Sequence, residues 1–244
     1  MERNLSRFAG VARSLLRDGV RLIVEVGARD CRETLGFEQL FPDARILAFE
    51  CNPDTLPACR AAVQGHARIR LIEKAVADKP GRMRFYPVDP ATNPGASSIF
   101  RASGKYELES YQQREIEVEA VTLESALAGE PRIDLLWMDI QGAELAALRG
   151  LGRRIADVAL IHLEAEFEEI YSGQPLFEEV CAFLDEAGFR FLGFTIYARH
   201  SADAVFANRA RFTALASLFA LARNRILIEK RLQFARHRLK RLLK

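Results

Sequence analysis

The chain has 244 residues, which is long enough for one sizeable α/β core with an appendage. Its apolar fraction of 49% and charged fraction of 28% are ordinary for a soluble globular protein, so composition alone names no function. The polar start MERNLSRFAG lacks the apolar core of a secretory signal, and the longest apolar run, at 212–222, is too short to span a bilayer. We therefore expect a cytoplasmic protein.

The net charge of +2 conceals a division between the body of the chain and its tail. Residues 209–244 contain eleven Lys or Arg and one acid, whereas residues 1–208 contain 24 basic and 32 acidic side chains. This asymmetry predicts a domain at 1–208 and a basic amphipathic helical tail at 209–244, with different tasks. The four cysteines form no CxxC pair and join no His cluster, so we expect free thiols in a reducing compartment.

The first part of the chain alternates between helical and extended patterns. Apolar side chains at helical spacing predict an amphipathic lead-in helix over residues 2–18. A helix is also predicted at 32–40, and another starts at Asn52, which suits the cap, with Pro53 in the first turn. Buried parallel strands are predicted at 21–27, 44–50 and 69–77, and a short extra strand at 82–88.

A long loop interrupts this alternation at residues 89–113, where prolines, glycines and serines show no period; such loops often act as lids. Further strands are predicted at 115–123, 132–139 and 157–166, helices at 142–151 and 175–188, and a closing pair of strands within 189–209. The alternation predicts an α/β fold with a doubly wound, mostly parallel sheet, an antiparallel closing strand pair and a C-terminal basic helix.

Nearly every predicted strand of the main sheet carries an acid at its carboxyl end. Open parallel sheets bind ligands at that edge. In strand order, the residues there are Glu25, Gly27 and Ala28, then Glu50 and Asn52, then Asp78, then Asp139, then Glu164 and Glu166. So many acids delivered to one edge predict a binding site.

The first two strand ends indicate a type of cofactor. Gly27 lets a ligand approach the backbone, and Glu50, about twenty residues further on, suits two ribose hydroxyls. The segment after Gly27 lacks the GxGxxG pattern that a dinucleotide pyrophosphate needs. An acidic edge without a phosphate cradle suits a positively charged nucleoside, a description that fits S-adenosylmethionine. The alternative, that Gly27 is only a turn glycine and Glu50 a surface acid, stays open.

Several segments resemble the FkbM-type methyltransferases, a branch of the class I S-adenosylmethionine-dependent family. They are VEVGARD at 24–30, LAFECNPD at 47–54, KAVADKPGRMRFY at 74–86, NPGASSIF at 93–100, VTLESAL at 121–127, IDLLWMDIQGAELAALRG at 133–150 and EAEFEEIYSGQPLFEEVCAFLDEAGF at 164–189. The resemblance covers about residues 20–208. This chain departs from the family's pattern at Cys31, where relatives usually have a glycine, and at Gln141, where many carry an acid.

The resemblance implies a Rossmann-like class I fold and a cofactor-binding set. That set is Glu25, Gly27, Ala28, Glu50, Asn52, Asp78 and Asp139. Within it, Glu25 and Gly27 would flank the methionine part of the cofactor, and Glu50 would hold the ribose. Asp78 would lie by the adenine, and Asp139 would lie where cofactor and acceptor meet.

Methyl transfer to a hydroxyl requires an oxygen held in line and benefits from a base. Asp139, Glu164 and Glu166 are the predicted catalytic residues, and strand alternation places the two glutamates on one face. His162 shares that face but lies inside an apolar strand, so we expect a packed core histidine. As an alternative, Asp139 and Glu164 could bind Mg²⁺ through oxygen ligands.

The tail repeats apolar residues at spacings of three, four or seven, and Lys or Arg fill most remaining positions from residue 223 onward. A basic amphipathic helix suggests a peripheral contact with an anionic membrane, such as the inner face of a cell membrane, or with a partner. The alternative is a helix that packs on its own domain or on a twin subunit. We expect no nucleic-acid partner, because the domain is acidic.

These observations favour an S-adenosylmethionine-dependent O-methyltransferase. The resemblance implies an acceptor hydroxyl on a sugar, glycan or secondary metabolite. Tyr171 and the pair Ser97–Ser98 are candidate acceptor contacts, or else an ordinary loop tyrosine and a turn. Two other functions remain open: a nicotinamide-dependent Rossmann enzyme, and a non-catalytic scaffold with a degenerate pocket that works through its basic tail.

Overall fold

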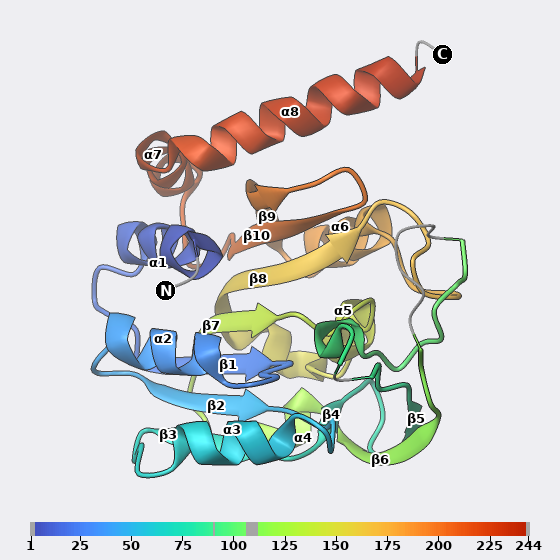
Figure 1. Cartoon of the computed structure of the whole chain (residues 1–244). Helices are drawn as coiled ribbons and strands as arrows, with labels where there is room; N and C mark the ends of the chain where they lie inside the picture. The colour runs from blue at the N-terminus through green and yellow to red at the C-terminus, as the bar shows by residue number, and fades with distance from the viewer. Residues whose placement is uncertain (1–2, 90, 106–111, 243–244) are drawn as a thin grey trace.

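The computed structural model describes residues 3–89, 91–105 and 112–242 (Figure 1). Its main sheet has seven strands in the order β3-β2-β1-β7-β8-β10-β9. Their bounds are β3 Ile69–Ile72, β2 Arg45–Phe49, β1 Leu22–Val26, β7 Ile133–Met138, β8 Val158–Glu166, β10 Ser201–Asn208 and β9 Phe189–Tyr197. A smaller sheet contains β4 (Ala75–Val76), β6 (Ile116–Val121) and β5 (Gly81–Phe85) in that order.

The first five strands of the main sheet are parallel, and β10 runs antiparallel between β8 and β9. β1 and β7 are buried along their whole length, as expected for the centre of a parallel sheet covered on both faces. The prediction of a doubly wound, mostly parallel sheet with an antiparallel closing pair is confirmed. In such a sheet the carboxyl ends of β1, β2, β7 and β8 share one edge, which is the right-hand edge in Figure 1.

Two apolar clusters hold helices against the two faces of the sheet. One joins α1 (Arg3–Leu15) and α2 (Arg32–Leu40) to the sheet, with Phe8 of α1 lying 5.6 Å from the Trp137 ring. The other face packs α4 (Leu123–Ala126), α5 (Glu144–Arg149) and α6 (Phe177–Glu186), largely through leucine side chains. This double cover leaves the carboxyl edge of the sheet as the open side of the domain.

Two predicted boundaries were wrong. The segment 69–77 is not one strand, because the chain turns at Glu73 and Lys74 and divides between β3 of the main sheet and β4 of the smaller one. The helix predicted from Asn52 is α3 (Leu56–Val63), which begins four residues later. Asn52 instead stabilises the preceding turn, since its side-chain oxygen accepts a hydrogen bond from the backbone N of Asp54 at 3.0 Å.

The predicted loop at 89–113 contains a short 3₁₀ turn, η1 (Pro94–Ala96), and isolated bridges but no longer element among its described residues; its residues 90 and 106–111 lie outside them. The loop is tied to the segment after β8. The backbone N of Ser103 donates to the carbonyl of Ile170, and that of Ser172 donates to the carbonyl of Arg101. The loop and the β8–α6 connection therefore form one unit beside the carboxyl edge.

Cys31 and Cys59 form a disulfide, which corrects the expectation of free thiols; Cys51 and Cys181 are free. The Cα atoms are 5.1 Å apart because the turn after β1 and helix α3 both pack over Ala48 of β2. Cys31 adopts a left-handed conformation with φ of 59°, the region that a glycine would adopt without strain. The cysteine thus keeps a glycine-like backbone geometry in this turn.

The tail contains two helices, α7 (Ala214–Arg223) and α8 (Arg225–Leu242), which are interrupted at Asn224. Helix α8 lies along β9 (Figure 1). A Cβ at Gly193 of β9 would stand 2.9 Å from the carbonyl oxygen of Leu227, so this glycine permits the close approach. No helix in the described ranges is both long enough and apolar enough to cross a membrane.

Candidate functional site

The strand register brings the predicted site residues into two rows on one face of the sheet. In the first row, Glu25 of β1 pairs with Trp137 of β7, which pairs with His162 of β8. Side chains two residues further along each strand point to the same face. This second row, at the carboxyl edge, consists of Gly27, Asp139, Glu164 and Asp203.

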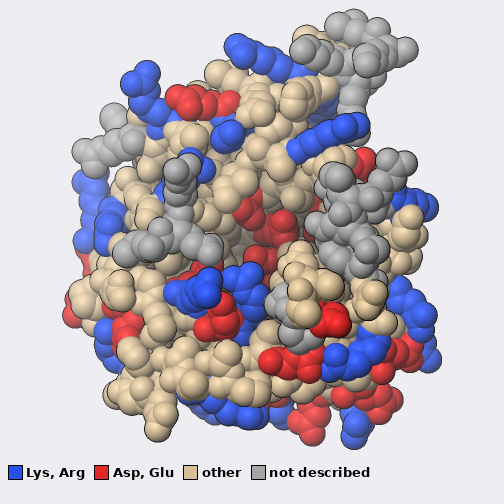
Figure 2. Space-filling view, viewed as in Figure 1, with Lys and Arg blue, Asp and Glu red and all other residues tan. Residues whose placement is uncertain are grey.

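A cleft opens at this edge, with about 1030 Å³ of empty space when the part open to solvent is included. Figure 2 shows acidic side chains gathered inside a hollow on this view of the molecule. The predicted residues that line the cleft are Glu25, Gly27, Glu50, Asn52, Ser97 and Asp139. The cleft therefore gathers residues from the ends of β1, β2 and β7 and from the long loop.

The backbone geometry at position 27 requires a glycine. Its φ is 89°, and an added Cβ would lie only 2.1 Å from the carbonyl oxygen of Asp139. The two strand ends approach this closely because the backbone N of Asp139 donates to the carbonyl of Val26 at 3.1 Å. The glycine therefore both opens the cleft beside β1 and sets the position of Asp139.

Backbone groups hold the carboxylate of Glu50 in one orientation. One oxygen accepts from the backbone N of Arg29 at 2.6 Å, and the other accepts from Cys51 and Asn52 at 2.9 and 2.7 Å. Burial raises the pKa of Glu50 above its usual value, and these three donors oppose the increase. The result is a preorganised acceptor at the end of β2.

Glu25 is a buried acid whose carboxylate accepts a hydrogen bond from the Thr34 hydroxyl at 2.5 Å. Burial raises the pKa of Glu25 to about 8; the Thr34 bond opposes the increase, and the nearby acids Glu33, Glu50 and Asp139 add to it. The cations that line the cleft are engaged elsewhere, Arg29 with Asp30 at 3.6 Å and Lys74 with Glu119 at 3.0 Å. The cleft is thus suited electrostatically to a cationic ligand.

Gln141 joins two of the predicted catalytic carboxylates. Its side-chain NH₂ donates to Asp139 at 2.8 Å and to Glu164 at 2.5 Å, and its side-chain oxygen accepts from the Tyr171 hydroxyl at 2.8 Å. The backbone of Gln141 has a φ of 55°, and its carbonyl accepts from the Ser98 hydroxyl at 2.7 Å. One amide therefore fixes the distance between two acids and ties both to the loop unit.

Three further acids, Glu144, Glu164 and Glu166, lie close enough to Asp139 to feel its charge. Burial, followed by the charge of Asp139, raises the pKa of Glu164 well above its usual value. Burial and the charge of Glu144 do the same for Glu166, one of whose oxygens is buried without a hydrogen-bond partner among the described residues. Burial raises the pKa of Glu144 to about 7, although the backbone N of Ile140 donates to it. Such closely packed carboxyls do not all ionise together at neutral pH.

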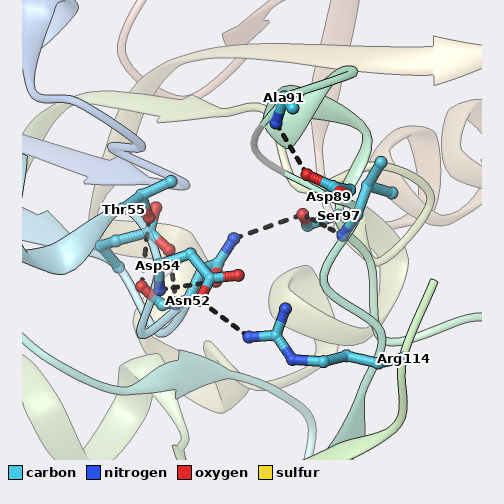
Figure 3. A network of polar contacts seen from close by, with 9 residues as sticks. Asn52, Asp54, Thr55, Asp89, Ala91, Ser97 and Arg114 are labelled. Carbon is cyan, nitrogen blue, oxygen red and sulfur yellow. Dashed lines mark hydrogen bonds and ion pairs between the residues drawn. The ribbon is translucent and has the colours of Figure 1, made fainter. Parts of the chain in front are cut away.

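The long loop is fastened to the turn after β2 (Figure 3). The side chain of Asn52 points toward Ser97 and donates to its hydroxyl at 3.3 Å, and Arg114 forms an ion pair with Asp54 at 2.7 Å. Ser97 also accepts from the backbone N of Val88 at 3.0 Å. Ser97 therefore lines the cleft, whereas Ser98 and Tyr171 are buried and hold Gln141.

His162 is a packed core histidine, as predicted. Its ring stacks on Trp137 with centroids 3.7 Å apart, and its Nε2 lies 2.9 Å from the hydroxyl oxygen of Thr195. Burial lowers the pKa of His162 to about 3. The ring is therefore neutral at physiological pH and does not act as a base there.

The depressed pKa of His162 predicts a pH-dependent stability. Between pH 3 and 6.5 the unfolded chain binds a proton at His162 that the folded chain does not, so the free energy of unfolding rises with pH. Over this window the free energy of unfolding of His162→Gln should rise less steeply with pH than that of the wild type, by up to about 1.4 kcal/mol per pH unit. Urea unfolding between pH 4 and 7 measures it, and equal slopes in both proteins would contradict the assignment.

Two of the predicted cofactor residues do not line the cleft. Ala28 is buried in the cluster around the disulfide, and Asp78 is exposed after β4, on the smaller sheet. Other residues that line the cleft were not predicted as site residues, among them Thr55, Lys74, Phe85 and Ile99. The only signal for Lys74 is its place after the apolar run at 69–72, and apolar residues such as Phe85 carry none.

The metal alternative finds no support in the geometry. Within residues 3–89, 91–105 and 112–242, no group of three or more His, Cys, Asp or Glu is arranged to hold a metal ion. Asp139 and Glu164 are instead joined through the amide of Gln141.

Comparisons with known proteins agree with this geometry. Residues 25–191 match the model of the methyltransferase FkbM domain. The 2-O-methyltransferase NoeI of Sinorhizobium fredii is 33% identical over 172 residues, which are 66% of this chain and 70% of that protein.

Solved structures share the fold. TrmK of M. capricolum, solved with S-adenosylhomocysteine, has a TM-score of 0.50 at 10% identity over 87% of this chain and 70% of its own. WbdD has a TM-score of 0.51 at 13% identity over 85% of this chain and 40% of its own. The extent of the FkbM match and the identity to NoeI, on a class I fold with an acidic cleft at its carboxyl edge, show that this chain belongs to the FkbM family of methyltransferases.

Proposed function

We propose that the chain transfers a methyl group from S-adenosylmethionine to a hydroxyl of a small molecule or glycan, most specifically a sugar hydroxyl. The observation that carries the proposal is the cleft with Glu25, Glu50 and Asp139 at three adjacent strand ends. Membership of a methyltransferase family supports the reaction. The naming of a 33% identical relative as a 2-O-methyltransferase supports oxygen as the acceptor atom.

The residues present fit this cofactor, which supplies a methyl group on a positively charged sulfur. Glu50, held by three backbone donors, would accept hydrogen bonds from ribose hydroxyls. Glu25 and Asp139 would face the cationic methionine part, and no Lys or Arg in the described chain forms an ion pair with either. Gly27 leaves the approach open, since any side chain there would collide with Asp139.

In this proposal Asp139 removes the proton from the acceptor hydroxyl. It is exposed and lines the cleft, whereas burial and mutual repulsion favour the protonated forms of Glu164 and Glu166. Gln141 positions the Asp139 carboxylate and keeps Glu164 within reach as a neutral neighbour. Base catalysis of this kind typically contributes about 10²–10⁴-fold to the rate.

The acceptor would enter beside the loop unit. Ser97 and Ile99 line the cleft from the loop, and the Tyr171 hydroxyl, which donates to Gln141, lies 3.0 Å from the carbonyl oxygen of Ala96 in the same loop. We infer that residues 1–208 carry the chemistry, because no described residue of the tail lines this cleft.

The first test is a calorimetric titration of the whole chain with S-adenosylhomocysteine, with NAD titrated in parallel. Binding of the first in the micromolar range and none of the second is the expected result. Binding of NAD alone would indicate a nicotinamide enzyme. Binding of neither by a chain that unfolds cooperatively would indicate a scaffold protein and contradict the proposal.

If Glu50 holds the ribose, Glu50→Gln should lower the affinity for S-adenosylhomocysteine by about 10- to 100-fold. The reason is that a hydrogen bond to a charged acceptor contributes about 1.5–3 kcal/mol. Glutamine keeps the size of the side chain. The matched control is Glu117→Gln, an exposed acid on β6 paired with Arg82, which should bind as the wild type does. Equal affinities of the two variants would remove Glu50 from the ribose site.

A further inference from the structure

Helix α8 has an apolar outer face that no described part of the chain covers. Ile228, Leu232 and Leu239 are 40%, 54% and 58% exposed. Spacings of four and seven residues place them in one stripe along the helix. Exposed leucines also occur on α7, at Leu215 and Leu218.

The inner face of α8 is firmly packed, so the outer stripe belongs to a fixed surface. Leu227 is buried, and the Phe234 ring lies 5.3 Å from Phe167 and 5.4 Å from Phe194. The hydroxyl of Tyr197 lies 3.0 Å from Nδ1 of His237. At 100° per residue the stripe lies on the side of the helix opposite Leu227 and Phe234, so it faces away from the sheet.

Exposed arginines flank the stripe on both sides. At 100° per residue, Arg225 and Arg236 fall on one flank, and Arg231 and Arg238 fall on the other. Within the described chain, no carboxylate forms an ion pair with these four; Arg231 lies over the Phe191 ring. An apolar strip between two rows of cations matches the acyl region and the phosphates of an anionic bilayer surface.

The same charges oppose a second copy of the chain as the occupant. A two-fold contact through this stripe would set each row of arginines against arginines of the partner. Three apolar side chains also offer far less than the roughly 800 Å² per partner that a standard interface buries.

We propose that the outer face of α8 binds an anionic phospholipid surface. Leucine and isoleucine side chains enter the interface, while the flanking arginines contact lipid phosphates. The contacts of Phe234 and His237 place the second half of α8 beside the ends of β8 and β9. Lipid binding therefore holds the carboxyl edge of the sheet close to the membrane.

The test is co-sedimentation of the full chain with vesicles. Phosphatidylcholine with 25% phosphatidylglycerol should bind at least about tenfold more tightly than phosphatidylcholine alone, since each basic residue near an anionic surface raises binding about fivefold. Leu232→Glu with Leu239→Glu should weaken binding to the mixed vesicles about tenfold or more. Ala58→Glu with Ala61→Glu, on exposed positions of α3 at the other side of the molecule, adds the same charge and should bind as the wild type does.

Three results would overturn the proposal. The first is equal binding to both kinds of vesicle, and the second is unchanged binding by the Leu232/Leu239 variant. The third is a wild-type dimer in sedimentation velocity that becomes a monomer in this variant, with no vesicle binding by either protein. The last result would make the stripe a subunit interface. Thermal unfolding and S-adenosylhomocysteine titration check the fold of each variant, and Leu232→Ala with Leu239→Ala replaces the glutamate variant if that one does not fold.

Discussion

Replacing Asp139 with asparagine is expected to lower turnover by about 10²–10⁴-fold, the usual contribution of a positioned base. Asparagine keeps the shape of the side chain, and its oxygen can still accept the hydrogen bond from Gln141 that Asp139 accepts at 2.8 Å. The fold should therefore remain, with cooperative melting. Formation of S-adenosylhomocysteine with a glycan acceptor measures turnover.

The control for this variant is Asp43→Asn, which removes an exposed carboxylate that lies 3.9 Å from Arg21. Asp43 does not line the cleft. The turnover of Asp43→Asn should equal that of the wild type. Persistent turnover in Asp139→Asn, with cooperative melting, would show that Asp139 is a structural residue and would leave Glu164 or Glu166 as the base.

Gly27→Ala should be the most damaging small substitution in the domain, costing about 2–4 kcal/mol of stability. The new methyl would lie 2.1 Å from the carbonyl oxygen of Asp139, and the φ of 89° strains any residue with a side chain. Relief requires the ends of β1 and β7 to separate, so S-adenosylhomocysteine binding should also be lost. Urea unfolding and calorimetry measure the two effects.

Substitutions at two other glycines distinguish the cost of the steric clash from the cost of the backbone strain. Gly65 has a φ of 84° with nothing near its Cβ position, so Gly65→Ala should cost only about 1–2 kcal/mol. Gly129 has neither a positive φ nor a close neighbour, and Gly129→Ala should be neutral or slightly stabilising. If Gly27→Ala costs no more than Gly65→Ala, the close approach to Asp139 is not essential.

The acids at the strand ends could be predicted because a charge after an apolar run is visible in the sequence. Glu25, Glu50 and Asp139 follow such runs and meet in the cleft, since parallel strands end at one edge. The register that aligns Asp139 with Glu164 follows from the same regularity. Local pattern and one general rule were sufficient for this part of the site.

Asp78 shows where local pattern fails. The run at 69–77 is apolar enough for one strand, but β4 pairs with β6, more than forty residues later in the chain. Only that distant partner draws residues 75–76 out of the main sheet. The disulfide between Cys31 and Cys59, which are 28 residues apart, likewise depends on two turns packing over the same strand. Contacts of this kind leave no periodic trace.

Gln141 was visible in the sequence only as a departure from an expected acid. Its function in the structure depends on three partners from three separate segments, at Asp139, Glu164 and Tyr171. A sequence gives the donor and acceptor capacity of an amide, but the direction in which the side chain points is set by packing.

The close contact between Gly27 and the Asp139 carbonyl has a consequence for redesign. Because one backbone contact positions both Gly27 and Asp139, the proposed cofactor position and the proposed base cannot be altered independently at these strands. A new acceptor preference should be sought at Ser97 and Ile99, which line the cleft, and in the β8–α6 connection, which is hydrogen-bonded to their loop. Libraries confined to those segments would vary selectivity while the rigid core of the enzyme stays unchanged.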